Sequence, residues 1–259
     1  MLRTIELKPG HGFDTSVHRR ELRVGGLTPF TSIDFPGRLS AVIFVQGCPL
    51  RCGYCHNPHL QQRKSASEMR WTPLLEWLHK RTGLLDGVVF SGGEPTVDPM
   101  LKEAIMQVRA LGFSIGLHSA GTHPRRMREI LPHIDWIGLD IKAPLDDVTK
   151  YERIAGARAS ALKAEACLQS VLSSGIEYEV RTTAHSLWLD DSALLQLSCG
   201  LAARGVKRFA LQLARATPHQ PAPHQIDYPA PATLQQIDKL FQHFSVRNEP
   251  AHTQGRNAA

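Results

Sequence analysis

Residues 41–58 read AVIFVQGCPLRCGYCHNP, and this stretch decides how the rest of the chain is interpreted. Its first part, 41–46, is a run of apolar, β-branched and aromatic residues that is typical of a buried parallel strand. Three thiols follow it on one loop, at Cys48, Cys52 and Cys55. Thiols this close together, directly after a strand, can converge on one metal centre.

The alternation of a short apolar run with a longer helical pattern continues beyond this stretch. Strands are predicted at 41–46, 87–90, 113–117, 134–141, 176–183 and 206–213. Such alternation predicts an α/β fold with a parallel sheet. Six β/α units are two short of a closed eight-fold barrel, so we expect an open (β/α)6 partial TIM barrel, with a doubly wound sheet as the alternative. In either fold, ligands bind at the C-terminal ends of the strands.

The composition bounds the class of protein. The chain has 259 residues, of which 42% are hydrophobic and 21% charged, which suits a folded core rather than disorder. The net charge of +6 is spread along the chain, so we expect no nucleic-acid binding, although it can help docking to an acidic partner. We find neither a membrane-spanning run nor the apolar core of a signal peptide, and therefore expect a cytoplasmic protein. In that compartment five cysteines indicate metal or catalytic work rather than disulfides.

Several metal centres are compatible with the cysteine loop alone. Zinc could use Cys48, Cys52, Cys55 and either His56 or His59, although the spacing is not that of usual zinc pairs. Residues 52–56 match the Cys-x-x-Cys-His pattern of covalent haem, which requires an exported chain. A redox dithiol would leave Cys48 unexplained, and buried thiols without a metal are a further reading. A cubane iron–sulfur cluster with three thiolates would leave one iron open to a substrate.

The spacing Cys-x3-Cys-x2-Cys, with the aromatic Tyr54 before its last cysteine, resembles the cluster loop of radical S-adenosylmethionine (SAM) enzymes. The resemblance implies a 4Fe–4S cluster held by Cys48, Cys52 and Cys55 in an open six-unit barrel. It also implies that the fourth iron binds the amino and carboxylate groups of SAM. Reductive cleavage of SAM then yields methionine and a 5′-deoxyadenosyl radical.

The second predicted strand ends in Ser-Gly-Gly-Glu-Pro at 91–95. By itself this is a common strand-to-helix turn, although two glycines allow a ligand to approach the backbone. The segment is similar to the Gly-Gly-Glu-Pro motif of the same family, which holds the amino group of SAM. The similarity makes Gly92, Gly93 and Glu94 candidates for that role.

Charged residues on the fourth and fifth predicted strands form a further group. Asp140 and Lys142 are two residues apart and share a face, so each could be the partner of the other. Their Asp-x-Lys pattern is similar to one that contacts SAM in activases of glycyl radical enzymes. Arg181 could bind a carboxylate, or it could neutralise Glu177 and Glu179 on its own strand.

The remaining candidates are weaker. Ser119 lies in the loop 118–121, whose equivalent in related activases helps to bind SAM and, in some, a monovalent cation. His118 departs from the carboxylate expected for that cation. Gln212, near the end of the sixth strand, is a candidate for the adenosine side. Cys167 and Cys199 lie in helical patterns and are interpreted as packing residues.

The resemblance extends to one group of activases. Segments 26–30, 32–37, 46–49 and 56–59 look like those of anaerobic ribonucleoside-triphosphate reductase activating proteins, and the likeness covers roughly residues 23–215. It implies a glycyl radical enzyme as partner and a flavodoxin or ferredoxin type of electron donor. The rivals are an activase of another glycyl radical enzyme such as pyruvate formate-lyase, a radical SAM enzyme acting on a small molecule, and a zinc-binding interaction module.

The chain is divided as follows on the basis of these patterns. Residues 1–22 are an N-terminal extension, and 23–215 are the core domain. The Pro-rich segment 216–232 is predicted to be a linker, 233–245 a C-terminal helix and 246–259 a disordered tail. Residues Gly25 and Gly26 are interpreted as a break that lies before the β/α repeat.

Overall fold

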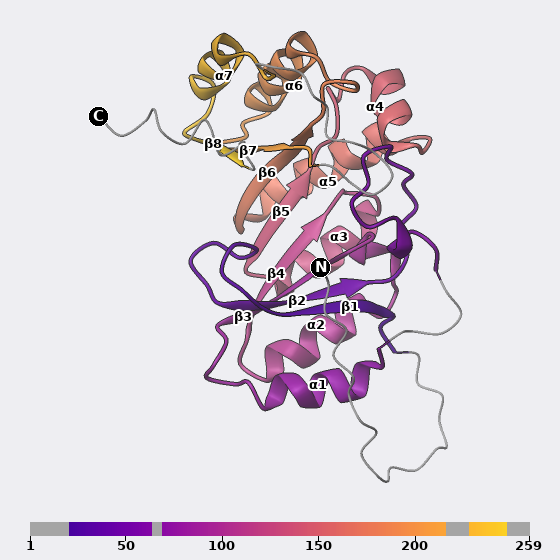
Figure 1. The fold of residues 1–259 in the computed structure, drawn as a ribbon. Coiled ribbons are helices and arrows are strands. Elements are labelled where there is room, and N and C mark those ends of the chain that lie inside the picture. Colours follow the sequence, from indigo (N-terminus) through magenta and orange to yellow (C-terminus); the bar gives the residue numbers. More distant parts are fainter. Residues whose placement is uncertain (1–20, 64–68, 216–227, 248–259) are drawn as a thin grey trace. The chain divides into compact units, whose positions relative to one another are not determined.

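The computed structural model describes residues 21–63, 69–215 and 228–247 of the chain (Figure 1). Its contacts divide it into two compact units. The first unit comprises residues up to Pro49, Asn57–Ser119 and Arg125–Ile137, and the second comprises Leu50–His56, Ala120–Pro124 and everything from Gly138 onward.

The first unit is a sheet with helices packed beside it. Strand β1 (Val24–Thr31) pairs antiparallel with β2 (Ser40–Val45), and β2, β3 (Gly87–Gly92) and β4 (Ser114–Ser119) are parallel. Helices α1 (Trp71–His79) and α2 (Leu101–Ala110) lie side by side in Figure 1, and α3 (Pro124–Ile130) follows β4. Short 3-10 turns are η1 (Pro58–Leu60), η2 (Pro95–Val97) and η3 (Leu131–His133). Phe35, Val42, Val89 and Trp136 form a buried cluster on this sheet.

The described residues of the second unit form three parallel strands and four helices after β5. Strands β6 (Glu177–Ala184), β7 (Arg208–Leu213) and β8 (His243–Arg247) pair in that order. Helix α4 (Val148–Ala155) contacts α5 (Ser160–Ser174), and α6 (Asp191–Ala203) contacts α7 (Pro231–Asp238). The chain passes from the first unit to the second within β5 (Trp136–Asp140).

The six predicted strands are present as β2 to β7, each displaced by no more than a few residues. Strand β1 was not predicted, because Gly25 and Gly26 looked like a break. The pairing of β1 with β2 contains a register shift between Val24 and Gly26. A bulge of this kind accommodates glycine inside a strand, so the two residues mark an irregularity and not an end.

Helix α4 is the second element that the sequence did not predict. Its start carries an ordinary signal, because the Asp147 side chain accepts a hydrogen bond from the Lys150 amide at 2.9 Å. Its end does too, because Gly156 adopts the left-handed conformation at φ +64°. The helix is only eight residues long, and its buried face consists of Tyr151, Ile154 and Ala155.

The predicted C-terminal helix 233–245 is wrong in its second half. Helix α7 starts earlier, at Pro231, which had been assigned to the linker, and ends at Asp238. Residues 243–247 form β8 instead, where Phe244 stacks on Phe209 of β7 with ring centroids 5.9 Å apart. The apolar positions of 234–244 fit a helical stripe, but pairing with the open edge of β7 outweighs that local preference.

The other predicted ends are described only in part. Leu22 of the predicted extension is buried, and Val246 and Arg247 of the predicted tail belong to β8. The rest of the extension (1–20), most of the linker (216–227) and the rest of the tail (248–259) lie outside the described residues.

One packing prediction is also wrong. Cys167 is fully buried in α5, as expected, but Cys199 of α6 is exposed. The buried residues Leu194, Leu197 and Leu201 define the inner face of α6, and position 199 falls on the opposite face.

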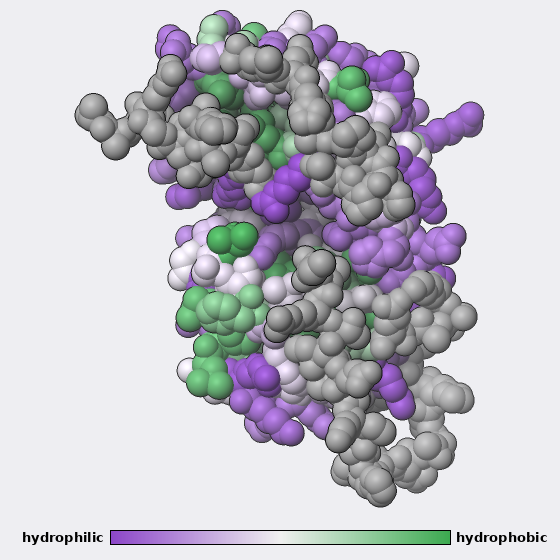
Figure 2. Space-filling view, viewed as in Figure 1, coloured by the Kyte–Doolittle hydropathy of each residue, from purple (hydrophilic) through white to green (hydrophobic). Residues whose placement is uncertain are grey.

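Figure 2 shows apolar residues in small groups among polar ones on the visible face. The large apolar side chains that are exposed in the described ranges include Ile33, Leu84 and Leu187. None of the helices described here combines the length and the apolar character that crossing a membrane requires.

Candidate functional site

In the first unit, the chain that leads into the cysteine loop is fixed by backbone hydrogen bonds. The Gly47 amide donates to the Leu60 carbonyl at 2.8 Å, and the Cys48 amide donates to the Gln61 carbonyl at 3.0 Å. The side chain of the buried Gln46 donates to the carbonyl of His59 at 3.1 Å. Cys48 therefore leaves β2 on a backbone that the η1 turn holds in place.

The Gly-Gly-Glu segment packs directly against this backbone. Gly92 has φ +127°, and a Cβ there would collide with the backbone of Val45. A Cβ at Gly93 would lie 2.8 Å from the carbonyl carbon of Gly47. Only glycine permits this approach. Gly92 and Gly93 remain half-exposed at the C-terminal end of β3, where a ligand can reach their backbone.

Glu94 differs from its two glycine neighbours because it is fully buried. Its Oε1 atom accepts hydrogen bonds from the Thr96 amide (3.1 Å), the Thr96 hydroxyl (2.5 Å) and the Ser119 hydroxyl (2.8 Å). Two predicted site residues, Glu94 and Ser119, are thus brought together at the ends of β3 and β4. Because the Glu94 carboxylate accepts a hydrogen bond from the Thr96 amide, it is the N-cap of η2.

Arg126 of α3 supports the same turn and was not predicted. Its Nη1 atom donates to the carbonyls of Thr96 at 2.7 Å and Val97 at 2.8 Å. The sequence did not distinguish Arg126 from its neighbours Arg125 and Arg128, because such a cluster of arginines is typical of a solvent-exposed helix face.

In the second unit, the rest of the cysteine loop lies against the end of α4. The Arg51 amide donates to the Ala155 carbonyl at 2.8 Å, and Cys52 Sγ lies 3.8 Å from the same oxygen. The Cys55 amide donates to the Cys52 carbonyl at 3.1 Å, which closes a tight turn. All three cysteines of the loop are half-buried, and none of them forms a disulfide.

The Tyr54 ring has an imidazole and an ammonium group as neighbours. Its ring is buried and stacks on His185 with centroids 6.2 Å apart and planes inclined by 25°. Lys142 Nζ lies 5.9 Å from the Tyr54 ring centroid, within cation–π range. His185 follows β6 and was not predicted, because an isolated histidine after a strand carries no pattern.

The charge of Lys142 is coupled to the cysteine loop. Burial raises the pKa of the Cys52 thiol, while the nearby Lys142 acts to lower it. Burial alone would lower the pKa of Lys142, but Cys52, Tyr54 and Asp140 outweigh burial and hold that pKa well above its usual value. Lys142 therefore stays cationic beside the thiols, which favours thiolate ligands.

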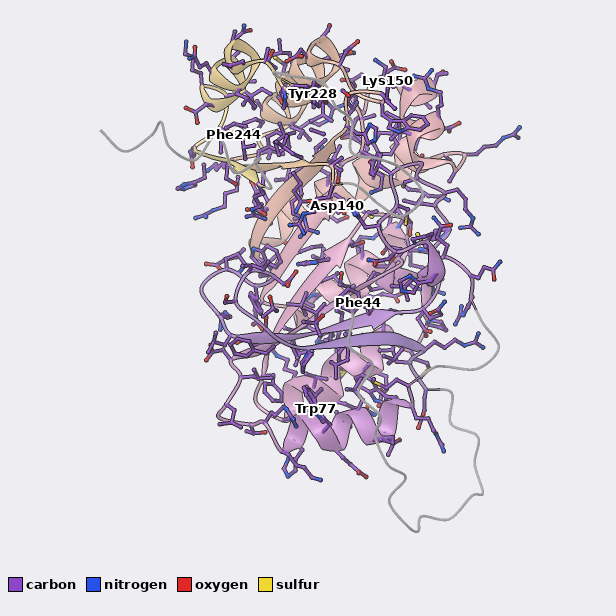
Figure 3. The ribbon with its side chains drawn as sticks, in the orientation of Figure 1. Phe44, Trp77, Asp140, Lys150, Tyr228 and Phe244 are labelled. Carbon is purple, nitrogen blue, oxygen red and sulfur yellow. The ribbon has the colours of Figure 1, made fainter. Side chains whose placement is uncertain are left out.

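The structure changes the predicted partners of the charged residues. Arg181 Nε donates to Asp140 Oδ1 at 2.9 Å. Asp140 is the last residue of β5 and is labelled in Figure 3. Arg181 Nη2 also lies 3.4 Å from the carbonyl of Gly138. Glu179, the partner considered for Arg181, instead binds Arg247 of β8 at 2.7 Å. The alternative in which Arg181 neutralises the glutamates of its own strand is therefore wrong.

The last two predicted positions lie at strand ends as well. Gln212 is half-buried near the end of β7, where it pairs in register with Thr183 of β6 and Arg247 of β8. In the first unit His118 donates from Nε2 to the Asp34 carbonyl at 2.9 Å and packs edge-on against Trp136. His118 thus has a hydrogen bond and a packing contact in β4, at the position where a carboxylate would be expected for a cation site.

No three His, Cys, Asp or Glu side chains of the described ranges gather as a preformed site for a single metal ion. A cubane cluster makes a different demand, because each thiolate binds a different iron. Three half-buried thiols on one loop, with the cationic Lys142 beside Cys52, fit such a cluster by the chemistry of the donors.

The fold and the loop define an α/β protein with an open parallel sheet and a three-cysteine loop at the end of its first parallel strand. The model of the radical SAM superfamily matches residues 42–187, more than half of the chain. The chain belongs to this superfamily. The superfamily implies a 4Fe–4S cluster and SAM, and the three cysteines fit its Cys-x3-Cys-x2-Cys motif.

Curated relatives cover about half of the chain. A protein of Methanocaldococcus jannaschii, provisionally named a glycyl-radical enzyme activating enzyme, is 32% identical over 49% of this chain and 53% of its own length. The pyruvate formate-lyase-activating enzyme of Clostridium pasteurianum is 35% identical over 52% of this chain and 57% of its own. The chain thus spans little more than half the length of these relatives.

Solved structures extend the likeness of the fold. SuiB of Streptococcus suis, bound to its precursor peptide SuiA, matches 82% of this chain and 48% of its own with a TM-score of 0.62 at 16% identity. QueE of Escherichia coli matches 88% of this chain and 95% of its own with a TM-score of 0.54, also at 16% identity. These matches confirm the predicted open partial TIM barrel.

Proposed function

We propose that this protein is an activase that uses SAM and a 4Fe–4S cluster to generate a glycyl radical on a partner enzyme. The observation that carries the proposal is the combination of the three-cysteine loop with relatives that are named as activating enzymes of glycyl radical enzymes. The Asp140-x-Lys142 pattern, which resembles that of such activases, supports the same function.

In this proposal Cys48, Cys52 and Cys55 hold the cluster. When bound, the cluster and SAM supply a one-electron reductive cleavage that produces a hydrogen-abstracting radical. Lys142 keeps a positive charge beside the cysteine loop and offsets the negative charge of thiolate ligands. The buried Tyr54 ring covers the loop on the side of His185 and limits the access of water there.

The residues proposed to contact SAM fall into two sets, one at the end of β3 and one in the second unit. The half-exposed backbone of Gly92 and Gly93 receives the amino group of SAM, while Glu94 and Ser119 hold that backbone in place. In the second unit, Arg181 and Lys142 attract the carboxylate of SAM. Asp140 orients Arg181, and Gln212 at the end of β7 contributes to the adenosine side.

The partner is the finer question. The sequence motifs at 26–37 predict an anaerobic ribonucleotide reductase, whereas the name of the relative from C. pasteurianum favours an enzyme of the pyruvate formate-lyase type. We propose the latter, since the chain is 35% identical to that activase over 139 residues. An electron donor of the flavodoxin or ferredoxin type is acidic, and the net charge of +6 favours its docking.

Electron paramagnetic resonance (EPR) tests this proposal. The chain is reconstituted with iron and sulfide without oxygen, reduced, and mixed with SAM and either pyruvate formate-lyase or anaerobic ribonucleotide reductase. A glycyl doublet on the lyase supports the proposal, and a doublet only on the reductase restores the prediction from the motifs. Cleavage of SAM with no radical on either protein would point instead to a small-molecule substrate. The Cys52→Ala variant is the matched control and should give no doublet.

A further inference from the structure

A tryptophan beyond the cysteine motif packs on the cysteine loop. Trp188 lies in the turn between β6 and α6, and its ring occupies the space where a Cβ at Gly53 would stand. The ideal Cβ position collides with Trp188 Cζ2 and lies 3.1 Å from Cε2 and 3.2 Å from Cη2. Position 53 therefore has to be glycine as long as the indole stays where it is.

The orientation of the indole brings its polar atom to this contact. Nε1 is bonded to Cε2, which is one of the three indole atoms nearest to that Cβ position, so the N–H group lies next to the contact with Gly53. Gly53 stands between Cys52 and Cys55 in the loop. The donor thus lies beside the segment that carries two of the three cluster thiols.

This N–H group is buried and has no hydrogen-bond partner among the described residues. The neighbouring Tyr54 is 6% exposed, and its hydroxyl is also buried. This hydroxyl likewise has no hydrogen-bond partner among the residues that the structure describes. A buried donor left without an acceptor costs roughly 1–3 kcal/mol, so two such groups, one in the cysteine loop and one packed against it, indicate an acceptor that arrives with a ligand.

We propose that Trp188 is a positioning residue for the iron–sulfur cluster: its ring fixes the Cys52–Cys55 turn, and its N–H donates a hydrogen bond to a sulfur of the bound cluster. The inference rests on the proposed cluster site. A sulfur atom is the acceptor that the cluster adds beside Gly53, and hydrogen bonds to cluster sulfurs stabilise the extra negative charge of the reduced state. The donor consequently raises the reduction potential.

The first test compares Trp188→Phe with the wild-type chain. Phenylalanine keeps an aromatic ring but has no donor. The variant should bind the same amount of iron, and its cluster should have a more negative midpoint potential in an anaerobic redox titration followed by EPR. The matched control is Trp77→Phe in α1, which lies in the first unit and should leave the potential unchanged (Figure 3).

An unchanged potential in Trp188→Phe overturns the inference. If that variant instead weakens SAM binding at an unchanged potential, the donor serves SAM and the assignment to sulfur is wrong. If the wild-type chain assembles no cluster, the proposed function fails together with the inference. A normal cluster with an insensitive potential leaves the proposed function intact, so the two failures are distinguishable.

The second test addresses the ring contact. Gly53→Ala introduces the Cβ that collides with the indole, and this variant should bind much less iron. The double variant Gly53→Ala/Trp188→Ala removes the obstacle and should regain most of the iron. If the double variant stays as depleted as the single one, the ring does not govern the position of the loop and this part of the inference is overturned.

Discussion

Two groups of buried polar atoms differ in how they are satisfied. Around Glu94 in the first unit, one carboxylate oxygen accepts three hydrogen bonds from Thr96 and Ser119. Around Tyr54 in the second unit, the Tyr54 hydroxyl and the Trp188 N–H are buried without a partner among the described residues. A cationic lysine lies close to the same ring.

The difference separates framework from ligand site. A satisfied buried network fixes one geometry, which is what the turn beside Cys48 requires. An unsatisfied buried group destabilises the protein on its own and is retained where a ligand offsets the cost. We therefore expect substitutions around Glu94 to act mainly on folding, and substitutions around the cysteine loop to act mainly on cofactor binding.

The largest effect is expected at the cysteines. Each of Cys48→Ala, Cys52→Ala and Cys55→Ala should abolish cluster assembly and the generation of a glycyl radical, because a cubane with two thiolate ligands is not retained. Iron and sulfide analysis of the reconstituted chain measures the loss.

The matched controls are the remaining cysteines. Cys199→Ala changes an exposed thiol and should keep full iron content and stability. Cys167→Ala should keep the iron as well but lose some stability, because that thiol is fully buried in α5. Loss of the cluster in Cys199→Ala would contradict the division between ligand and packing cysteines.

A smaller effect is expected at Arg181. Its replacement by alanine leaves Asp140 without its guanidinium partner and should lower the free energy of unfolding by roughly 2 kcal/mol, since Arg181 is buried while Asp140 is a third exposed. It should also weaken SAM binding. Chemical denaturation of the apoprotein and equilibrium dialysis with SAM measure the two effects.

Arg125→Ala is the control for Arg181. It removes an exposed ion pair with Glu129 one helical turn away and should change stability by less than about 0.5 kcal/mol. Equal losses in the two variants would show that the burial of the Asp140–Arg181 pair is without consequence.

The smallest effect is expected for Glu94→Gln. The amide keeps an oxygen acceptor for the Ser119 and Thr96 hydroxyls, so the free energy of unfolding should fall by less than about 1 kcal/mol and SAM affinity should be retained. Glu94→Ala removes the acceptor and should cost roughly 2 kcal/mol. A stable Glu94→Gln variant that no longer binds SAM would make the carboxylate a ligand and break the comparison.

The parts predicted best from the sequence have a local signal. The apolar runs at 41–46 and 87–90 are β2 and β3, because a buried parallel strand needs continuous apolar residues. The spacing of Cys48, Cys52 and Cys55 is by itself enough to indicate a cluster-binding loop. Both signals are independent of distant contacts.

The parts that were missed depend on distant contacts. Strand β8 forms because β7 has an edge to pair with, and the helical pattern of 234–244 does not encode that edge. Trp188 matters because it meets Gly53, 135 positions earlier in the chain, and no periodicity connects the two residues. Arg181 pairs with Asp140 because β5 and β6 are neighbouring strands. The pattern of charges along one strand does not show which strand lies next to it.

The central claim is that the three-cysteine loop holds a cluster with an iron open to SAM. Low-temperature EPR of the reconstituted, reduced chain before and after SAM is added tests it most directly. A signal from a reduced 4Fe–4S cluster that changes when SAM binds is the predicted result. A colourless protein that contains zinc and gives no cluster signal, or a cluster whose signal is unaffected by SAM, would contradict the claim.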